Sequence, residues 1–167
     1  ADARDLLIAS VLCKDPVVYI DDRWLYEQED ELPPVVEMDL KSQIPLITQT
    51  GTDIAIVASG HASLLARGAS VKLRKKGVSA EVIDIRVLNP LNVDVIIESV
   101  IKTKHFLVID SGCLSAGFSA EIIAKVMERL SVDCLNKPPV RIALPDAPAP
   151  TSRVIEKAYY TSVDDVA

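Results

Sequence analysis

Residues 104–124 read KHFLVIDSGCLSAGFSAEIIA, and this stretch decides the fold. An apolar run, Phe106 to Ile109, ends at Asp110 and enters a loop bracketed by Gly112 and Gly117. Apolar residues then recur every three or four positions, as on one face of a helix. Strand, glycine loop and amphipathic helix predict one β-loop-α unit of a parallel sheet. In such sheets ligands and partners gather at the carboxyl ends of the strands, where this loop lies.

The same order of elements repeats along most of the chain. Apolar runs predict strands and amphipathic stretches predict helices, namely strands at 54–58, 80–85, 106–109 and 139–144 and helices at 62–76, 93–101, 118–130 and 151–160. Gly77 predicts the end of the first helix, and Asn92 predicts the start of the second. Short connections between alternating elements indicate an α/β protein, a three-layer α/β/α sandwich with a largely parallel sheet.

Composition bounds the class of protein. The chain has 167 residues, 49% of them hydrophobic, with two Phe, one Trp and four Tyr, so the core of one domain must be aliphatic. The net charge of −6, from 24 acids and 18 bases, argues against nucleic-acid binding. No apolar stretch approaches the ~20 residues of a membrane span. We therefore expect neither a nucleic acid nor a membrane as partner.

Cysteine usage and the amino terminus suggest a location. Three scattered cysteines, Cys13, Cys113 and Cys134, are too few for a disulfide framework or a metal cluster and predict reduced thiols. Leu6 to Cys13 is apolar but lacks the basic leader and cleavage site of a targeting signal. The predicted location is the cytoplasm, or the mitochondrial matrix in a eukaryote. The start at Ala1, without Met, suggests a piece of a longer protein.

The first fifty residues depart from the α/β pattern. A helix over residues 2–12 and a short strand over residues 17–20 cannot bury their apolar faces alone. From Asp21 to Thr50 acids and prolines occur without periodicity, which predicts an extended linker. Trp24, Leu25 and Tyr26 could pin this linker onto a neighbouring surface.

The glycine loop has the spacing of a phosphate-binding loop but not its chemistry. Gly112-x-x-x-x-Gly117 continues with Phe118-Ser119, where a P-loop has Lys followed by Ser or Thr. A tight turn or close backbone packing is therefore favoured over a nucleotide site. Because helix N-termini attract anions, weak anion binding at Gly60-His61 or Gly117-Phe118 stays open.

The titratable residues do not form a catalytic constellation. His61, at a strand-to-helix turn, is a candidate for lining a functional site, whereas His105 precedes a buried strand and is interpreted as structural. Asp84 and Asp110 end strands, where a general acid or base could stand, but an ion pair between Asp84 and Arg86 is favoured. We predict no catalytic, cofactor-binding or metal site that is complete within this chain.

Four segments carry a resemblance to a known family. They follow one another in the family's order and spacing, as EVIDIRVLNPL at 81–91, SVIKT at 99–103, GFSAEI at 117–122 and DAPAP at 146–150. Together they resemble the C-terminal domain of the transketolase-like thiamine-diphosphate enzymes. SVIKT points to the β subunit of the decarboxylase component of 2-oxoacid dehydrogenases, of the pyruvate or branched-chain type.

The resemblance implies a domain division and a place for the cofactor. Residues 1–22 resemble the tail of the family's pyrimidine-binding domain, residues 23–50 its extended linker, and residues 51–167 its transketolase C-terminal-type domain. The chain lacks the Gly-Asp-Gly metal motif, and the family's catalytic glutamate and histidine precede Ala1. Thiamine diphosphate and magnesium would therefore be bound elsewhere in the intact enzyme.

The implied role is structural. By resemblance, the domain contacts a second copy of the β subunit and the α subunit, and helps to dock the subunit-binding domain of a dihydrolipoyl acyltransferase. Candidate interface residues are Asp110, Gly112, Gly117, Phe118 and Glu121. The family usually has Glu followed by glycines where this chain has Asp110-Ser111-Gly112. Alternatives are the same domain of a transketolase or deoxyxylulose-phosphate synthase, or a stand-alone module that binds an anion or a protein.

Overall fold

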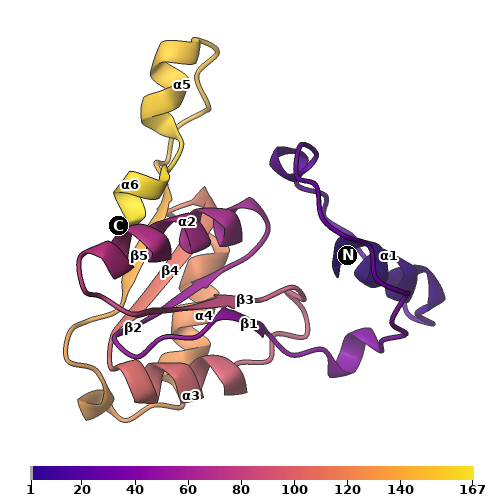
Figure 1. Ribbon diagram of the computed structural model, residues 1–167, viewed down its shortest axis with the longest axis horizontal. Coiled ribbons are helices and arrows are strands. Elements are labelled where there is room, and N and C mark those ends of the chain that lie inside the picture. Colours follow the sequence, from indigo (N-terminus) through magenta and orange to yellow (C-terminus); the bar gives the residue numbers. More distant parts are fainter. Residues whose placement is uncertain (1) are drawn as a thin grey trace.

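The computed structural model describes residues 2–167, except for the side chain of residue 132. Five strands form one sheet in the order β1-β3-β2-β4-β5. They are β1 Leu46–Gln49, β2 Ile54–Ala58, β3 Ala80–Asp84, β4 Phe106–Cys113 and β5 Val140–Leu144. β2 to β5 run parallel, and β1 is antiparallel to β3. Figure 1 shows this sheet between helices.

Helices cover both faces of the sheet, as expected for a three-layer α/β/α sandwich. Helices α2 His61–Lys75 and α6 Val163–Val166 cover one face, and α3 Asp94–Thr103 and α4 Phe118–Met127 cover the other. Alternate residues of β2 enter the two cores, which confirms a strand buried on both faces. Each fully buried Val, Leu or Ile side chain of these cores contributes about 1.5–3 kcal/mol.

Gly77 ends α2 as predicted, whereas α3 begins one residue later than predicted, with Val93 and not Asn92 in the N-cap position. Gly77 follows α2 with φ of 83°, a conformation that glycine adopts without strain. Its N–H donates to the carbonyl of Arg74 at 3.1 Å. Asn92 Oδ1 accepts the N–H of Asp94 at 2.9 Å, so Asn92 satisfies a free donor of the first turn of α3.

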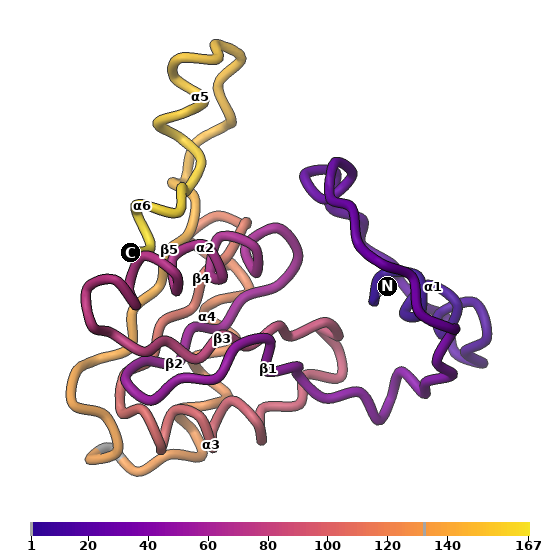
Figure 2. Tube along the Cα trace, in the orientation of Figure 1, coloured from indigo at the N-terminus to yellow at the C-terminus, as the bar shows by residue number. Residues whose placement is uncertain are grey.

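Two segments project from this layered body (Figure 1, Figure 2). The amino-terminal extension, residues 2–45, contains α1 Asp2–Leu12 and two 3-10 turns, Arg23–Leu25 and Leu40–Ser42. The C-terminal extension, residues 145–160, contains α5 Arg153–Tyr159, which has no buried residue. Within residues 2–167, none of the helices is long and apolar enough to cross a membrane.

Two expectations for the first fifty residues were wrong. Residues 17–20 form no strand, because no strand among residues 2–167 lies alongside to pair with them. Residues 46–49, expected to be irregular, form β1 at the edge of the sheet. The four residues of β1 are too few for a periodic signal, and the strand depends on pairing with β3, more than thirty residues away. The short helix α6 was also not predicted.

Candidate functional site at the carboxyl ends of the strands

The parallel strands end on one side of the sheet, where the order of strands reverses. The chain passes from β2 to β3 on one side and then returns to β4 on the other side of β2. Open α/β sheets bind their ligands outside the carboxyl ends of the strands at such a point. Three connections meet there, namely residues 59–61 after β2, residues 85–93 after β3 and residues 114–117 after β4.

Asp110 closes the glycine loop at the start of α4. Its Oδ1 accepts the N–H of Gly112 at 2.8 Å, and its Oδ2 accepts the N–H of Ser119 at 2.7 Å. A carboxylate is favoured here because the first N–H groups of a helix are free and the dipole is positive. A Cβ on Gly117 would lie 2.1 Å from the carbonyl oxygen of Cys113. The interpretation of this loop as a tight turn with close backbone packing is therefore confirmed.

Asp22, from the amino-terminal extension, occupies the start of α2 in the same way. Its Oδ2 accepts the N–H of His61 at 2.7 Å, and its Oδ1 accepts the N–H of Trp24 at 3.1 Å. Gly60 has φ of 56°, and a Cβ at this residue would lie 2.9 Å from Asp22 Oδ2. Carboxylates of the chain thus occupy both helix starts that were candidates for anion binding.

Four rings form an aromatic cluster above the start of α2, made of Trp24, His61, Tyr159 and Tyr160. The Trp24 and His61 rings stack with centroids 5.4 Å apart and planes at 30°. Trp24 meets the edge of Tyr160 at 5.6 Å, and Tyr160 meets Tyr159 at 5.0 Å. Trp24 therefore pins this part of the amino-terminal extension onto the start of α2, as predicted. The exposed Tyr26 instead donates a hydrogen bond to Asp21 within its own segment.

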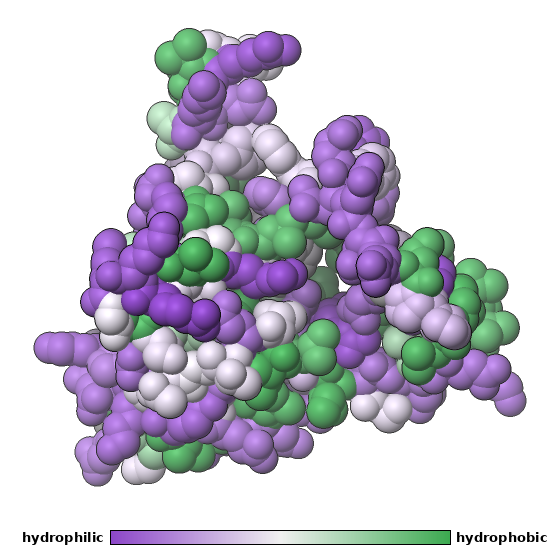
Figure 3. All heavy atoms as spheres, viewed as in Figure 1, coloured by the Kyte–Doolittle hydropathy of each residue, from purple (hydrophilic) through white to green (hydrophobic). Residues whose placement is uncertain are grey.

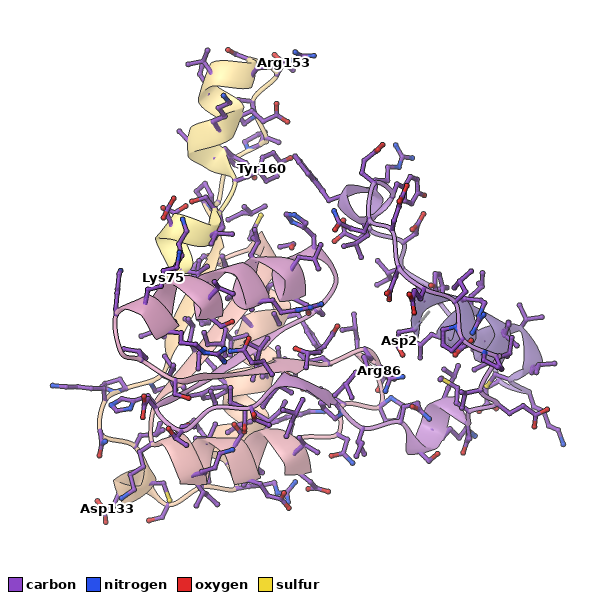
Figure 4. All side chains as sticks on the ribbon, viewed as in Figure 1. Asp2, Lys75, Arg86, Asp133, Arg153 and Tyr160 are labelled. Carbon is purple, nitrogen blue, oxygen red and sulfur yellow. The ribbon has the colours of Figure 1, made fainter. Side chains whose placement is uncertain are left out.

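The expected ion pair between Asp84 and Arg86 does not form in the described part of the chain. Arg86 donates instead to Asp2 of α1, with Nε at 2.8 Å from Oδ2 and Nη2 at 2.6 Å from Oδ1. Figure 4 shows these two residues side by side. Arg86 has φ of 64°, so the alternation of the strand breaks at this residue and its side chain leaves the face that Asp84 occupies.

The Asp84 carboxylate accepts one hydrogen bond from the backbone. The N–H of Arg86 donates to its Oδ1 at 3.3 Å. Burial raises the pKa of Asp84, and the nearby Ser63 hydroxyl and the Arg86 N–H counteract this rise only in part. Asp84 is thus a carboxyl group that burial holds closer to its neutral form.

A buried acid in β3 was missed by the sequence analysis. The side chain of Glu81 is 1% exposed, and its Oε2 accepts hydrogen bonds from Lys102 Nζ of α3 and from the N–H of Gly51, the latter at 3.3 Å. Burial alone would raise the pKa of Glu81, but the bonds from Lys102 and Gly51, together with the nearby Ser99 hydroxyl, outweigh it and leave the pKa lowered. The signal was an acid inside the apolar run AEVID.

The candidate interface residues gather at one junction. Asp110, Gly112, Gly117 and Phe118 lie where β4 passes into α4, and Phe118 packs against the core. Glu121, in the first turn of α4, is exposed and lies 3.4 Å from Lys125. Glu121 is therefore exposed next to a turn whose backbone is held by the hydrogen bonds of Asp110.

The remaining titratable groups point to structure. His105 Nδ1 lies 2.8 Å from the carbonyl oxygen of Asp53, to which it donates, in agreement with a structural role. Among residues 2–167, no group of three or more His, Cys, Asp or Glu is arranged to hold a metal ion. At the carboxyl ends of the strands, two buried hydroxyls, Ser63 Oγ and Ser119 Oγ, have no hydrogen-bond partner in the described part of the chain.

A family model and a solved structure that resemble this chain both belong to transketolase-type α/β proteins. A family model described as "Transketolase, C-terminal domain" matches residues 45–166. A solved structure described as a split-gene transketolase, an inactive β4 tetramer, shares the fold with a TM-score of 0.66 and 19% identity. That match covers 83% of this chain and 43% of the solved one.

Relatives align along nearly the whole chain. The β subunit of the pyruvate dehydrogenase E1 component of Saccharomyces cerevisiae is 36% identical, over 93% of this chain and 43% of its own length. The Bacillus subtilis counterpart is 35% identical, over 91% and 46%. The β subunit of acetoin:2,6-dichlorophenolindophenol oxidoreductase of Bacillus subtilis is 32% identical, over 99% and 48%. The chain spans less than half the length of each of these relatives.

Proposed function

The chain belongs to the transketolase C-terminal domain family, and on that premise we propose that it is the C-terminal part of a thiamine-diphosphate-dependent 2-oxoacid dehydrogenase β subunit. The observation that carries this proposal is the alignment with pyruvate dehydrogenase E1 β subunits over 91–93% of the chain at 35–36% identity. The role we assign is assembly: contact with a second β subunit and the α subunit, and docking of the acyltransferase's subunit-binding domain.

The surface of the amino-terminal extension supports a place within a larger protein. Large aliphatic residues are exposed along it, and Val18, for example, is 87% exposed. Figure 3 shows such hydrophobic residues gathered over this extension, at the right of the view. Large exposed apolar patches mark contact surfaces. We therefore assign residues 1–22 to the end of a preceding pyrimidine-binding domain and the following stretch to a linker, except that β1 joins the sheet.

The chain's own residues do not fit thiamine diphosphate. A diphosphate seeks free N–H groups at a helix start. The Asp22 and Asp110 carboxylates already accept such groups at α2 and α4, and their charge would repel a diphosphate. We therefore propose that the cofactor and its magnesium are held by other parts of the intact enzyme, and we assign no catalytic step to this chain.

The junction of β4 and α4 is our proposed interface. The hydrogen bonds of Asp110 and the close packing at Gly117 hold its backbone in one conformation. A rigid base of this kind loses little entropy on binding. The exposed Glu121 adds a charge at its rim, where charges steer association and set its salt dependence.

Light scattering on the whole chain tests this proposal. We expect a dimer, and binding of an acyltransferase subunit-binding domain that weakens as salt rises. Glu121→Lys should weaken either dimer formation or binding of the subunit-binding domain. Glu128→Lys, an equal charge change at the other end of α4, should weaken neither. A monomer that ignores the subunit-binding domain would contradict the assembly role.

The acetoin oxidoreductase relative supports a second candidate, the β subunit of an enzyme that acts on acetoin. Both candidates place the chain in the same position of a β subunit. An intact enzyme that contains this chain, assayed with pyruvate and with acetoin, separates them. Turnover of acetoin alone would favour the second candidate.

A further inference from the structure

We propose that residues 21–26 form a latch, which closes over the carboxyl end of β2 and couples the amino-terminal extension to the C-terminal extension. Asp22 and Trp24 are its working residues. They contact the start of α2 through His61 and the C-terminal extension through Tyr160. Three segments that are far apart in the sequence therefore meet at one point.

The carboxylate contact gives the latch its position. Asp22 accepts N–H groups from His61 and Trp24, so it caps α2 and fixes the turn that carries Trp24. The contact also depends on Gly60, where a Cβ would lie within 2.9 Å of the carboxylate. A side chain that caps a helix from another segment holds that segment against the helix.

The aromatic contacts give the latch its second partner. Trp24 stacks on His61 and meets the edge of Tyr160. The Tyr159 hydroxyl donates to the carbonyl of Ala147 at 2.8 Å, which folds the C-terminal extension back on itself. Because α5 has no buried residue, the extension is otherwise held only at its two ends, by β5 and by α6.

The latch makes so few contacts that it can open locally. Trp24 remains 57% exposed, and segments with few buried contacts open locally at low cost. Since Trp24 contacts both α2 and Tyr160, release of the amino-terminal side deprives Tyr160 of its partner. By linkage, release of the C-terminal side must loosen Trp24 to the same extent.

The experiment uses Trp24 as a reporter, because it is the single tryptophan of the chain. In Asp22→Ala we expect Trp24 emission to move to longer wavelength. We also expect trypsin to cleave after Arg153 and Lys157 about fivefold faster, since cleavage follows the open population and loss of a cap changes it by this factor. Asp22→Asn keeps one acceptor oxygen and so only one of the two N–H bonds, and it should lie between Asp22→Ala and the parent chain. Glu29→Ala, which removes an exposed acid of the same extension, should behave like the parent chain.

The reciprocal variant tests the coupling itself. Tyr160→Ala should speed tryptic cleavage after Arg23, inside the latch, although the substitution lies in the other extension. Circular dichroism should show an unchanged fold, because the sheet cores contain none of these residues. If Asp22→Ala leaves cleavage after Lys157 at the parent rate, or Tyr160→Ala leaves cleavage after Arg23 unchanged, the two extensions are not coupled and the proposal fails.

Discussion

The carboxylate of Glu81 lies within the sheet and accepts a hydrogen bond from the ammonium group of Lys102, which reaches it from α3. The two partners differ in exposure, since the Glu81 side chain is 1% exposed and the Lys102 side chain is 47% exposed. A charge removed from water is costly unless it is paired and hydrogen-bonded. Lys102 therefore makes the burial of Glu81 tolerable.

We expect Lys102→Met to destabilise the chain by about 2 kcal/mol, measured by urea unfolding at pH 7. Loss of one partner of a fully buried pair costs about 3–5 kcal/mol, and water at the half-exposed Lys102 reduces that figure. Lys125→Met, which breaks the exposed pair with Glu121, should change stability by less than about 0.5 kcal/mol.

The pH dependence gives the same pair an independent test. The pKa of Glu81 is lowered in the folded chain because the bonds from Lys102 and Gly51, together with the nearby Ser99 hydroxyl, outweigh burial. Its contribution is therefore full above the unfolded pKa of about 4.3 and is lost as pH falls through the lower folded pKa. The difference between parent and Lys102→Met should shrink below about pH 4. An equal difference at pH 7 and in acid would exclude this explanation.

The contribution of Asp84 to stability should depend on pH with the opposite sign to that of Glu81. Burial raises its pKa in the folded chain, so its contribution to stability is full below the unfolded pKa of about 3.9 and is lost as pH rises through the folded pKa. Asp84→Asn, which can still accept the Arg86 N–H, should be as stable as the parent or more stable at pH 7. This gain in stability of Asp84→Asn over the parent should vanish at acidic pH.

Asp133→Asn is the matched control for this substitution, because Asp133 is exposed on the turn before β5 (Figure 4). The free energy of unfolding of Asp133→Asn should stay within about 0.5 kcal/mol of the parent value at every pH. If Asp84→Asn is instead less stable than the parent at pH 7, the ionised carboxylate makes a favourable contact, and burial does not dominate at this site.

The sequence predicted the body of the fold because local patterns suffice there. β2 and β4 are apolar runs that any buried parallel strand requires, and Gly77 ends α2 by its own backbone preference. β1 could not be found in this way, since its four residues become a strand only through β3. The run at residues 17–20 consists entirely of β-branched and aromatic residues but lacks a partner strand among the described residues.

The candidate site was predicted only in part, for the same reason. The glycine loop and the pinning by Trp24 followed from residue type and position. The cap by Asp22 joins residues 39 positions apart, and no local pattern distinguishes it from the other acids of its segment. Arg86 was assigned to Asp84 by strand alternation, which its positive φ interrupts. Long-range contacts and single unusual dihedral angles lie outside what periodicity can reveal.

Gly68 should control the packing of the last helix. A Cβ at Gly68 of α2 would lie 2.9 Å from Cγ2 of Val163, so α6 packs against the space that glycine leaves. Gly68→Ala improves helix propensity by about 1 kcal/mol but forces the two helices apart. We expect faster amide exchange in α6, together with unchanged or greater stability of α2.

Val163→Ala should relieve this clash, and the two substitutions should therefore be coupled. In a double-mutant cycle, Gly68→Ala should cost less in the Val163→Ala background, with an interaction energy of about 0.5 kcal/mol or more. Additive effects would mean that α6 is held mainly by polar contacts, such as Lys72 with Asp164 at 2.5 Å and Lys76 with the carbonyl of Ala167 at 3.0 Å.

Gly117 should be the least replaceable residue of the glycine loop, for reasons of space alone. Its backbone is extended, but a Cβ would lie 2.1 Å from the Cys113 carbonyl oxygen, which is main chain and cannot rotate away. At Gly112 the nearest atom to an added Cβ is Oδ1 of the Asp110 side chain, at 3.1 Å. We expect Gly117→Ala to cost about 2 kcal/mol or more in thermal or urea unfolding, and Gly112→Ala about 1 kcal/mol or less. Equal costs would show that the loop can widen, and would remove the argument that this junction is a rigid base for a partner.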